Sequence, residues 1–171
     1  MKEISIIIPI LNESENVKLL IPEISKNIKI LKILKYEIIL VDDNSEDQIE
    51  LVVKKLRKKF KSLKLLIRKK KDKDLSKSCI LGFEKSKYKN ILVMDGDFQH
   101  HPKYILNLVR NFNRTNCDIV VGARDLTSTK KTKLSIFRLG SSFIVTTFLN
   151  IAFGKKTSDP LTGFFLFKKE I

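Results

Sequence analysis

Five short apolar runs recur along the chain, separated by longer segments with a different periodicity. The runs lie at residues 4–10, 36–42, 63–68, 90–95 and 118–123. Their apolar residues are continuous rather than alternating, a pattern typical of strands that are covered on both faces, as in a parallel sheet. We therefore predict a strand at each of the five runs.

The segments between these runs have the spacing of amphipathic helices. Apolar residues recur every three or four positions over 17–31, although Pro22 inside this segment predicts a kink or a restart. The sequence Ser45-Glu46-Asp47-Gln48 has the form of a capping box and predicts that a second helix begins there. Two more helices are predicted over 75–88 and 102–113. Such regular alternation predicts a single α/β domain, a mostly parallel sheet with helices on both faces.

Polar residues collect where the predicted strands end. Four clusters have this position: Asn12-Glu13, Asp42-Asp43-Asn44-Ser45, Asp95-Gly96-Asp97 and Gly122-Ala123-Arg124. One such cluster alone would be explained by a turn or a helix cap. Ligands of open α/β sheets bind beyond the carboxyl ends of the strands, and all four clusters fall at that edge. We therefore predict that this edge carries the functional site.

The segment ILVMDGDFQHHP, residues 91–102, suggests a metal site at that edge. Asp95 and Asp97 bring two carboxylates to one region, and Gln99 adds a carbonyl oxygen. Mg²⁺ and Mn²⁺ prefer such oxygen ligands and complete their shell with water and substrate phosphates. Gly96 between the two carboxylates lets the backbone approach a bulky ligand. The alternative is an ordinary acidic turn, because this triplet is common.

Other nucleotide-binding signatures and other metal ligands receive less support. The chain has neither a GxxxxGK[ST] loop nor a GxGxxG segment, so a P-loop and a dinucleotide fingerprint are not indicated. His100 and His101 follow the acidic segment directly. We predict that they lie at the start of the next helix rather than on the metal.

The charge of the chain favours anionic partners. Lysine and arginine total 34 against 19 acids, a net charge of +15, and twelve of the basic residues lie between Lys54 and Lys73. A solvated helix face, a nucleic-acid site and an anionic membrane surface are the three interpretations. The segment lacks the interleaved aromatics of a single-strand nucleic-acid platform, which favours the membrane surface. The apolar stretch 143–153 is about half the ~20 residues that a spanning helix needs, so we expect peripheral contact only.

Five motifs in order give the chain a family resemblance. They are IIIPILNESENV, YEIILVDDNSED, VMDGDFQHHP, DIVVGAR and SDPLTGFFLFKKE, and together they span essentially all 171 residues. The chain resembles family-2 glycosyltransferases of the GT-A type, specifically the dolichyl-phosphate mannosyltransferase and polyprenyl-phosphate glycosyltransferase group. The resemblance implies one GT-A, Rossmann-like catalytic domain over residues 1–171. It also implies that the usual C-terminal continuation of such enzymes is missing.

The resemblance assigns roles to individual residues. Those implied to bind the nucleotide sugar are Pro9, Leu11, Glu13, Val41, Asp43, Asp95, Gly96, Asp97, Gln99 and Arg124. Val41 and Asp43 would lie at the base and ribose. The metal, Mg²⁺ or Mn²⁺, would be held by Asp95, Asp97 and Gln99. Arg124 and Arg138 would face the sugar or the acceptor phosphate, and these two arginines together with Asp97 are the expected catalytic residues.

These assignments predict metal-dependent, inverting transfer of a hexose to a polyprenyl or dolichyl phosphate. A divalent ion would offset the charge that builds on the leaving diphosphate, and a lipid phosphate is largely ionised at neutral pH. GDP-mannose is the favoured donor and UDP-glucose the alternative. We expect a cytoplasmic protein, peripheral at the inner face of the cell membrane, with no nucleic-acid partner. The rival hypotheses are a transferase that acts on a glycan, a basic nucleic-acid-binding protein and an inactive fragment.

Overall fold

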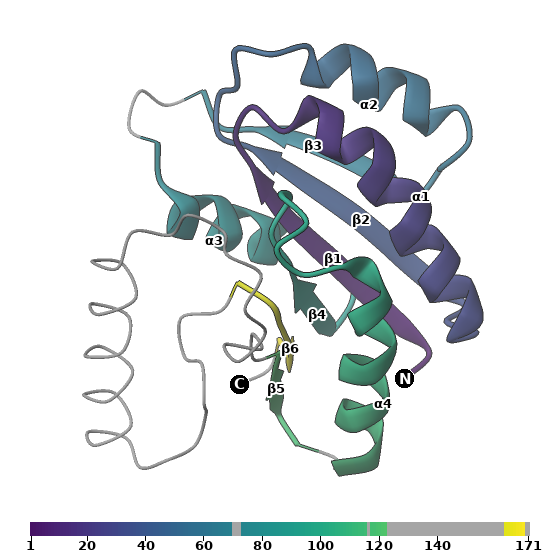
Figure 1. Cartoon of the computed structure of the whole chain (residues 1–171). Helices are drawn as coiled ribbons and strands as arrows, with labels where there is room; N and C mark the ends of the chain where they lie inside the picture. Colours follow the sequence, from purple (N-terminus) through teal and green to yellow (C-terminus); the bar gives the residue numbers. More distant parts are fainter. Residues whose placement is uncertain (70–72, 116, 123–162, 170–171) are drawn as a thin grey trace, which may run out of the picture.

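A computed structural model describes residues 1–69, 73–115, 117–122 and 163–169 of the chain (Figure 1). Within these ranges the strands form one six-stranded sheet in the order β3-β2-β1-β4-β6-β5. The strands are β1 (Glu3–Ile10), β2 (Lys35–Asp42), β3 (Leu63–Ile67), β4 (Asn90–Val93), β5 (Ile119–Val121) and β6 (Phe165–Lys168). All five predicted strands are present.

The sheet is mostly parallel, as predicted. β1 pairs in parallel with β2 and β4, and β2 pairs in parallel with β3. The exception is β6, which lies antiparallel between β4 and β5. This strand was not predicted, because its four residues belong to the segment that was interpreted only as a motif. Its insertion places residues 165–168 beside β4, the strand that leads to Asp95.

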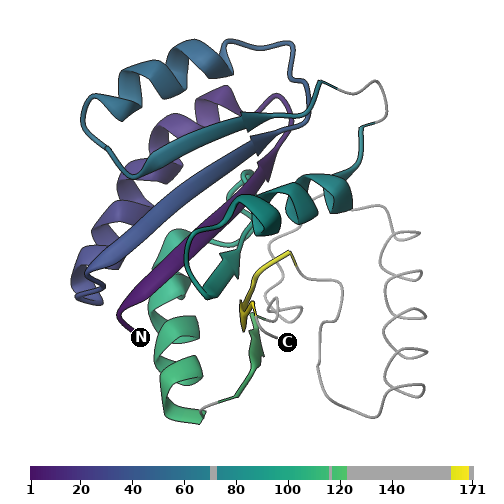
Figure 2. The same ribbon diagram turned by 180° about the vertical axis from the view of Figure 1, so that it is seen from behind.

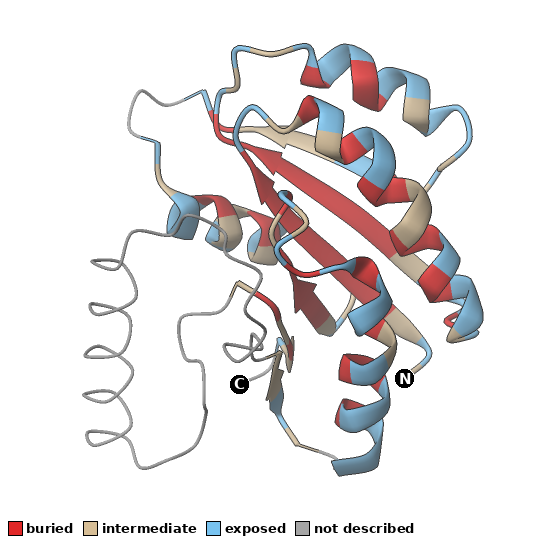
Figure 3. Cartoon of the chain, in the orientation of Figure 1, coloured by how far each residue is buried: buried red, intermediate tan, exposed pale blue. Residues whose placement is uncertain are grey.

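Helices cover both faces of the sheet, as predicted (Figures 1 and 2). They are α1 (Ser14–Ile30), α2 (Ile49–Arg57), α3 (Leu75–Lys85) and α4 (Ile105–Thr115), with a short 3-10 turn, η1 (Pro102–Tyr104), before α4. The apolar sides of α1, α2 and α4 pack with one face of the central strands into the larger core. Residues of α3 pack against the opposite face, around Ile7, Ile39 and Val41. The central strands are consequently buried on both faces (Figure 3).

The structure tests the predicted course of two helices. Of the two alternatives at Pro22, a kink or a restart, the restart does not occur: the helix α1 runs without a break from Ser14 to Ile30, and Leu20, Ile21 and Ile24 on both sides of the proline are buried in the core. The helix α3 ends at Lys85 rather than Tyr88, since the backbone is extended at Ser86.

The predicted capping box does not form. The helix α2 begins at Ile49, not at Ser45, and Ser45 contacts other partners. Its hydroxyl donates to Asp42 and accepts a hydrogen bond from the backbone N–H of Asn12 at 2.8 Å. The segment before α2 is therefore part of the edge of the sheet rather than of the helix.

Among the described residues, none of the helices has the length and apolar character needed to cross a bilayer.

Candidate active site

The loops after β1 and β2 are joined into one rim. Pro9 and Val41 are register partners in these two strands, and both are buried. Beyond them, the Asn12 side chain accepts a hydrogen bond from the backbone of Glu46 at 2.9 Å. The backbone of Asn12 has a φ of 59°, a left-handed conformation that asparagine tolerates better than most residues. The predicted residues Pro9 and Val41 thus lie at the base of a well-connected polar edge.

The acidic loop after β4 lies against the end of β1. A side chain on Gly96 would place its Cβ 2.9 Å from Cγ2 of Ile10 and 3.7 Å from Cγ of Glu13, so the close approach requires glycine. The would-be Cβ is also 3.6 Å from the carbonyl oxygen of Pro9. The structure therefore brings together three residues that the sequence assigned to one site, namely Pro9, Glu13 and Gly96.

Asp97 is exposed at the tip of this loop. Its two carboxylate oxygens accept hydrogen bonds from the backbone and the side-chain amide of Gln99, at 3.0 Å and 2.7 Å. Phe98 between them has a φ of 62°, and this left-handed turn lets the two side chains meet. Asp97 and Gln99 therefore form one exposed polar group at the tip of the loop.

Asp95 contacts a segment that is distant in the sequence. A methyl group on Gly163 would overlap the carboxylate of Asp95, so this glycine leaves room for the half-buried acid. The next residue, Phe164, is buried and stacks on His100 with ring centroids 5.0 Å apart. The carbonyl of Phe164 also accepts a hydrogen bond from Gly122 N at 2.8 Å. The start of β6 thus links the acidic loop to the end of β5.

The two histidines lie as the sequence predicts. His101 is the N-cap residue of η1, and its Nδ1 accepts a hydrogen bond from Lys103 N at 3.2 Å. His100 is buried against Phe164. The positions of both rings are explained by packing and capping at the start of the η1–α4 segment.

The acidic loop suits a divalent ion that is shared with a substrate. Within the described ranges, no group of three or more His, Cys, Asp and Glu side chains is arranged as a protein-only metal cage. Mg²⁺ and Mn²⁺ commonly use one or two carboxylates and take their remaining ligands from water and phosphates. The set Asp95, Asp97 and Gln99 has that chemistry, with one carboxylate exposed and the other half-buried.

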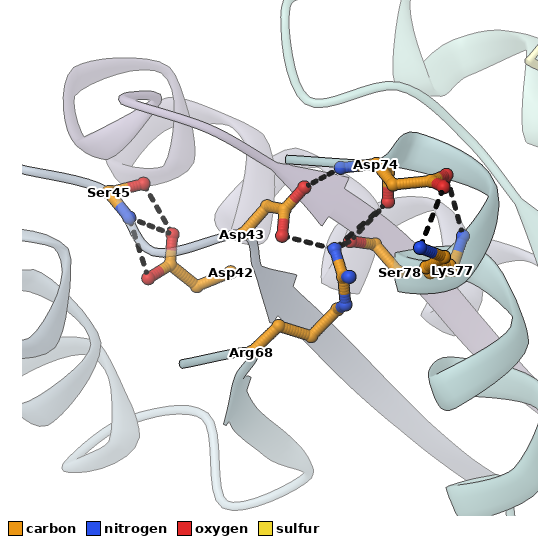
Figure 4. Close-up of polar contacts among 7 residues, drawn as sticks. All are labelled: Asp42, Asp43, Ser45, Arg68, Asp74, Lys77 and Ser78. Carbon is orange, nitrogen blue, oxygen red and sulfur yellow. Dashed lines mark hydrogen bonds and ion pairs between the residues drawn. The ribbon is translucent and has the colours of Figure 1, made fainter. Parts of the chain in front are cut away.

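The adjacent acids Asp42 and Asp43 face different partners (Figure 4). Asp42 accepts hydrogen bonds from the backbone and hydroxyl of Ser45 and so shapes the rim. Asp43, only 5% exposed, forms an ion pair with Arg68 and accepts a hydrogen bond from Asp74 N at 2.5 Å. Asp43 is therefore held between the ends of β2 and β3 and the start of α3.

Arg68 also lies at this edge, although the sequence analysis did not assign it to the site. It was one of twelve basic residues in a segment interpreted as a charged surface, yet it is only 8% exposed. The available signal was its position as the last residue of the predicted strand 63–68, since the predicted strand 36–42 ends at Asp42 and is followed by Asp43. Parallel neighbouring strands end at the same edge, so an arginine there is expected to meet these acids.

The remaining predicted residues are divided between the rim and the undescribed part of the chain. Leu11 lies on the rim and is 38% exposed. A cleft of about 450 Å³ opens between the ends of β2 and β3 and the start of α2, lined in part by Asp42, Asn44 and Lys69. Arg124 and Arg138 lie outside the described residues.

A comparison with protein families decides the classification. The profile of Glycosyl transferase family 2 matches residues 5–171. The chain belongs to this family. The family-2 membership that the motifs suggested is therefore confirmed, and the six-stranded α/β sheet is the GT-A fold.

Curated relatives of this family-2 chain include dolichol-phosphate mannosyltransferases. The enzyme of that name from Pyrococcus furiosus is 32% identical over 171 residues, which is 99% of this chain and 47% of the relative. The one from Mycosarcoma maydis is 28% identical over 123 residues, 70% of this chain and 41% of the relative. The chain thus spans about half the length of the curated relatives it matches.

Solved structures of similar fold include glucosyl-3-phosphoglycerate synthase from Mycobacterium tuberculosis. Its complex with phosphoglyceric acid matches with a TM-score of 0.70 at 18% identity, over 99% of this chain and 57% of that one. A second complex of the same enzyme, with Mn²⁺, UDP-glucose and phosphoglyceric acid, also gives 0.70, at 17% identity over the same shares. At this identity the likeness supports the fold.

Proposed function

We propose that the chain transfers a hexose, mannose in the first instance, from a nucleoside-diphosphate sugar to a polyprenyl phosphate, with inversion at the anomeric carbon. The observation that carries the proposal is the 32% identity to a dolichol-phosphate mannosyltransferase over 99% of the chain. The acidic loop supports it, because Asp97, Gln99 and the half-buried Asp95 form an oxygen-rich group at the edge where α/β sheets bind ligands.

The donor would lie across the rim, with its nucleoside near Pro9, Val41 and Asp43 and its diphosphate at the acidic loop. Asp95, Asp97 and Gln99 would hold Mg²⁺ or Mn²⁺, which offsets the negative charge that develops on the leaving diphosphate. Gly96 lets the acidic loop lie close to the end of β1, since a side chain there would meet Ile10. Glu13 and Leu11 would complete the nucleotide side of the site.

The acceptor would be oriented by Arg124 and Arg138, which complete the proposed catalytic set with Asp97. Arginine binds phosphate through paired hydrogen bonds, so two arginines can hold a lipid phosphate and separate its charge from the diphosphate. An ionised phosphate is already a nucleophile at neutral pH, and no strong base is needed. Because the acceptor is a membrane lipid, we place the protein at a membrane surface, peripheral on the cytoplasmic face.

Donor binding is the first test of this proposal. The melting temperature of the chain is measured with MnCl₂ or MgCl₂ alone, with GDP or UDP alone, and with each metal and nucleotide together. A ligand that binds only the folded state raises this temperature, so the proposal expects a rise with metal plus GDP that exceeds the sum of the separate effects. No rise with any combination would overturn it.

Turnover is the second test. Labelled GDP-mannose and UDP-glucose are each incubated with a short polyprenyl phosphate, and the lipid product is extracted. Mannosyl lipid from GDP-mannose is the expected product. Product from UDP-glucose alone would assign the alternative donor, and transfer to a glycan acceptor but not to lipid would overturn the lipid-phosphate part of the proposal.

A further inference from the structure

The buried ion pair between Asp43 and Arg68 lies beneath the proposed nucleoside site. Asp43 follows β2 directly and Arg68 follows β3 directly, so the pair closes the edge between two neighbouring parallel strands. The side chains of both residues are 7% exposed. An arginine buried to this degree needs its charge to be matched, and Asp43 supplies the opposite charge.

The same guanidinium also contacts the start of α3 (Figure 4). Nη1 of Arg68 donates to the carbonyl oxygen of Asp74 at 3.1 Å and to the hydroxyl of Ser78 at 3.4 Å. The backbone N–H of Asp74 in turn donates to the second carboxylate oxygen of Asp43 at 2.5 Å. Asp43, Arg68 and Asp74 therefore form a closed ring of contacts among three elements.

This ring fixes the direction of the Asp43 carboxylate. One oxygen is held by Arg68 and the other by Asp74 N, so the group cannot rotate without breaking a charge-assisted hydrogen bond. Each carboxylate oxygen can accept more than one hydrogen bond, which leaves capacity for a donor from a nucleoside. A hydrogen-bond acceptor that is already fixed in one rotamer binds a ligand more tightly than a mobile one, because it loses no conformational entropy on binding.

We propose that Arg68 is a positioning residue for the nucleoside end of the donor site, which it serves by fixing Asp43. The inference rests on the proposed function, because it takes Asp43 to contact a nucleoside diphosphate. It separates the site into two ends. Arg68 acts on the nucleoside end, whereas the acidic loop of Asp95, Asp97 and Gln99 acts on the diphosphate end.

Two ligands distinguish these ends. GDP contains both a nucleoside and a diphosphate, while inorganic pyrophosphate contains only the second part. With MnCl₂ present, Arg68→Met is expected to weaken GDP binding about tenfold, equivalent to about 1.4 kcal/mol, and to leave pyrophosphate binding unchanged. UDP replaces GDP if the unsubstituted chain binds UDP more tightly. Dissociation constants are measured by titration calorimetry.

Lys64→Met is the matched control. Lys64 lies on β3 and pairs at 2.6 Å with the buried Glu37 of β2, at the opposite end of the same two strands. Its loss removes another ion pair between the same two strands, one in which the basic side chain is half exposed, at the end away from the rim, so it is expected to lower stability without changing GDP affinity. A double-mutant cycle with Asp43→Asn adds a second readout. If Arg68 acts through Asp43, Arg68→Met has little further effect on GDP affinity in the Asp43→Asn background.

The outcomes separate positioning from general stabilisation. Equal loss of GDP and pyrophosphate binding in Arg68→Met, or equal loss of GDP binding in Lys64→Met, would overturn the proposal and leave the proposed function standing. If Arg68→Met does not fold, Arg68→Lys decides. Lysine keeps the charge on a shorter, unforked side chain, and unchanged GDP affinity would count against the inference. If the unsubstituted chain binds neither nucleotide, both the inference and the proposed function fail.

Discussion

At the scale of single residues, Asp97 is the most direct test of the acidic loop. Asp97→Ala is expected to abolish manganese-dependent GDP binding, a loss greater than the roughly 10–100-fold typical of groups behind the metal ligands. Stability should change little, because the side chain is exposed and its hydrogen bonds are to the neighbouring Gln99. Calorimetric titration with and without MnCl₂ measures the effect. Glu84→Ala, which removes an exposed acid of α3, is the control, and normal binding by the Asp97 variant would exclude Asp97 as a ligand.

Gly163 provides a second residue-level prediction, for the other acid of the loop. Gly163→Ala adds a methyl group where the carboxylate of Asp95 lies, so the acid must move. We expect manganese-dependent GDP binding to weaken about tenfold, with a loss of about 1–3 kcal/mol in stability. Ser25→Val is the control, because it adds bulk at a buried position of α1, outside the residues assigned to the site. Similar GDP affinity in both variants would show that the Gly163 contact does not position Asp95.

Some of these residues were visible in the sequence and others were not. Asp95, Gly96 and Asp97 are adjacent and follow an apolar run, so local pattern was enough to predict their place at the strand end. The contact between Gly163 and Asp95 joins residues far apart in the chain, and no local pattern encodes it. The position of Arg68 could not be predicted for a different reason. It stands in a basic run, and only its partner across the sheet distinguishes it from the exposed lysines around it.

At the scale of elements, we expect the buried Glu37, at the end of β2 opposite the rim, to make stability depend on pH. Glu37 of β2 accepts hydrogen bonds from Lys64 Nζ and Ser5 Oγ, both at 2.6 Å, and from Lys87 N at 2.5 Å. Burial alone would raise the pKa of Glu37. The bonds from Lys64, Ser5 and Lys87, with the charge of Lys64, outweigh burial and lower the pKa below 4.5.

This lowered pKa predicts a loss of stability in acid. A carboxyl group whose folded pKa lies below its unfolded value stabilises the fold above the unfolded value, and the contribution disappears as pH falls through the folded pKa. Glu37→Gln is therefore expected to cost about 1–3 kcal/mol at pH 7, and the gap to the unsubstituted chain should narrow below pH 4.5. Urea unfolding from pH 3 to pH 7 measures the difference in stability, with Glu50→Gln, at an exposed position of α2, as the control. If the difference in unfolding free energy between the two chains did not change with pH, Glu37 would not have a lowered pKa in the folded state.

The strands and helices could be predicted from the sequence where nearby residues determine them, and could not where distant contacts do. The central strands β1, β2 and β4 have apolar residues buried on both faces, and their continuous apolar runs indicate this directly, whereas β3 and β5 have similar runs but are only partly buried. The predicted start of α2 was wrong because the Ser45 hydroxyl accepts a hydrogen bond from the backbone of Asn12, 33 residues away, instead of capping the helix that follows it. The strand β6 was missed because its place depends on a gap between β4 and β5 that only the assembled sheet provides.

At the scale of the whole molecule, the proposed lipid acceptor requires contact with a membrane, and the basic segment from Lys54 to Lys73 is the expected contact. Its apolar residues turn inward, since Leu63 is buried and Leu56, Phe60 and Leu65 pack against the core. Lysines of α2 and of the turn after it remain exposed. The apolar stretch 143–153, the other expected contact, lies outside the described residues.

We therefore expect the chain to bind vesicles that contain anionic lipid and to release them as salt rises. Each lysine near such a surface contributes about 1 kcal/mol, and this attraction is screened over about 10 Å at 0.1 M salt. Sedimentation with anionic and neutral vesicles, at low and high salt, measures binding.

Two variants carry equal charge changes: Lys54, Lys58, Lys59 and Lys61 to glutamine, and Lys18, Lys32, Lys85 and Lys103 to glutamine. The first should lose more binding than the second, because its charges lie within one segment. Equal loss in both would assign the attraction to the net charge of +15, and equally weak sedimentation with both vesicle types would exclude a membrane role for this segment.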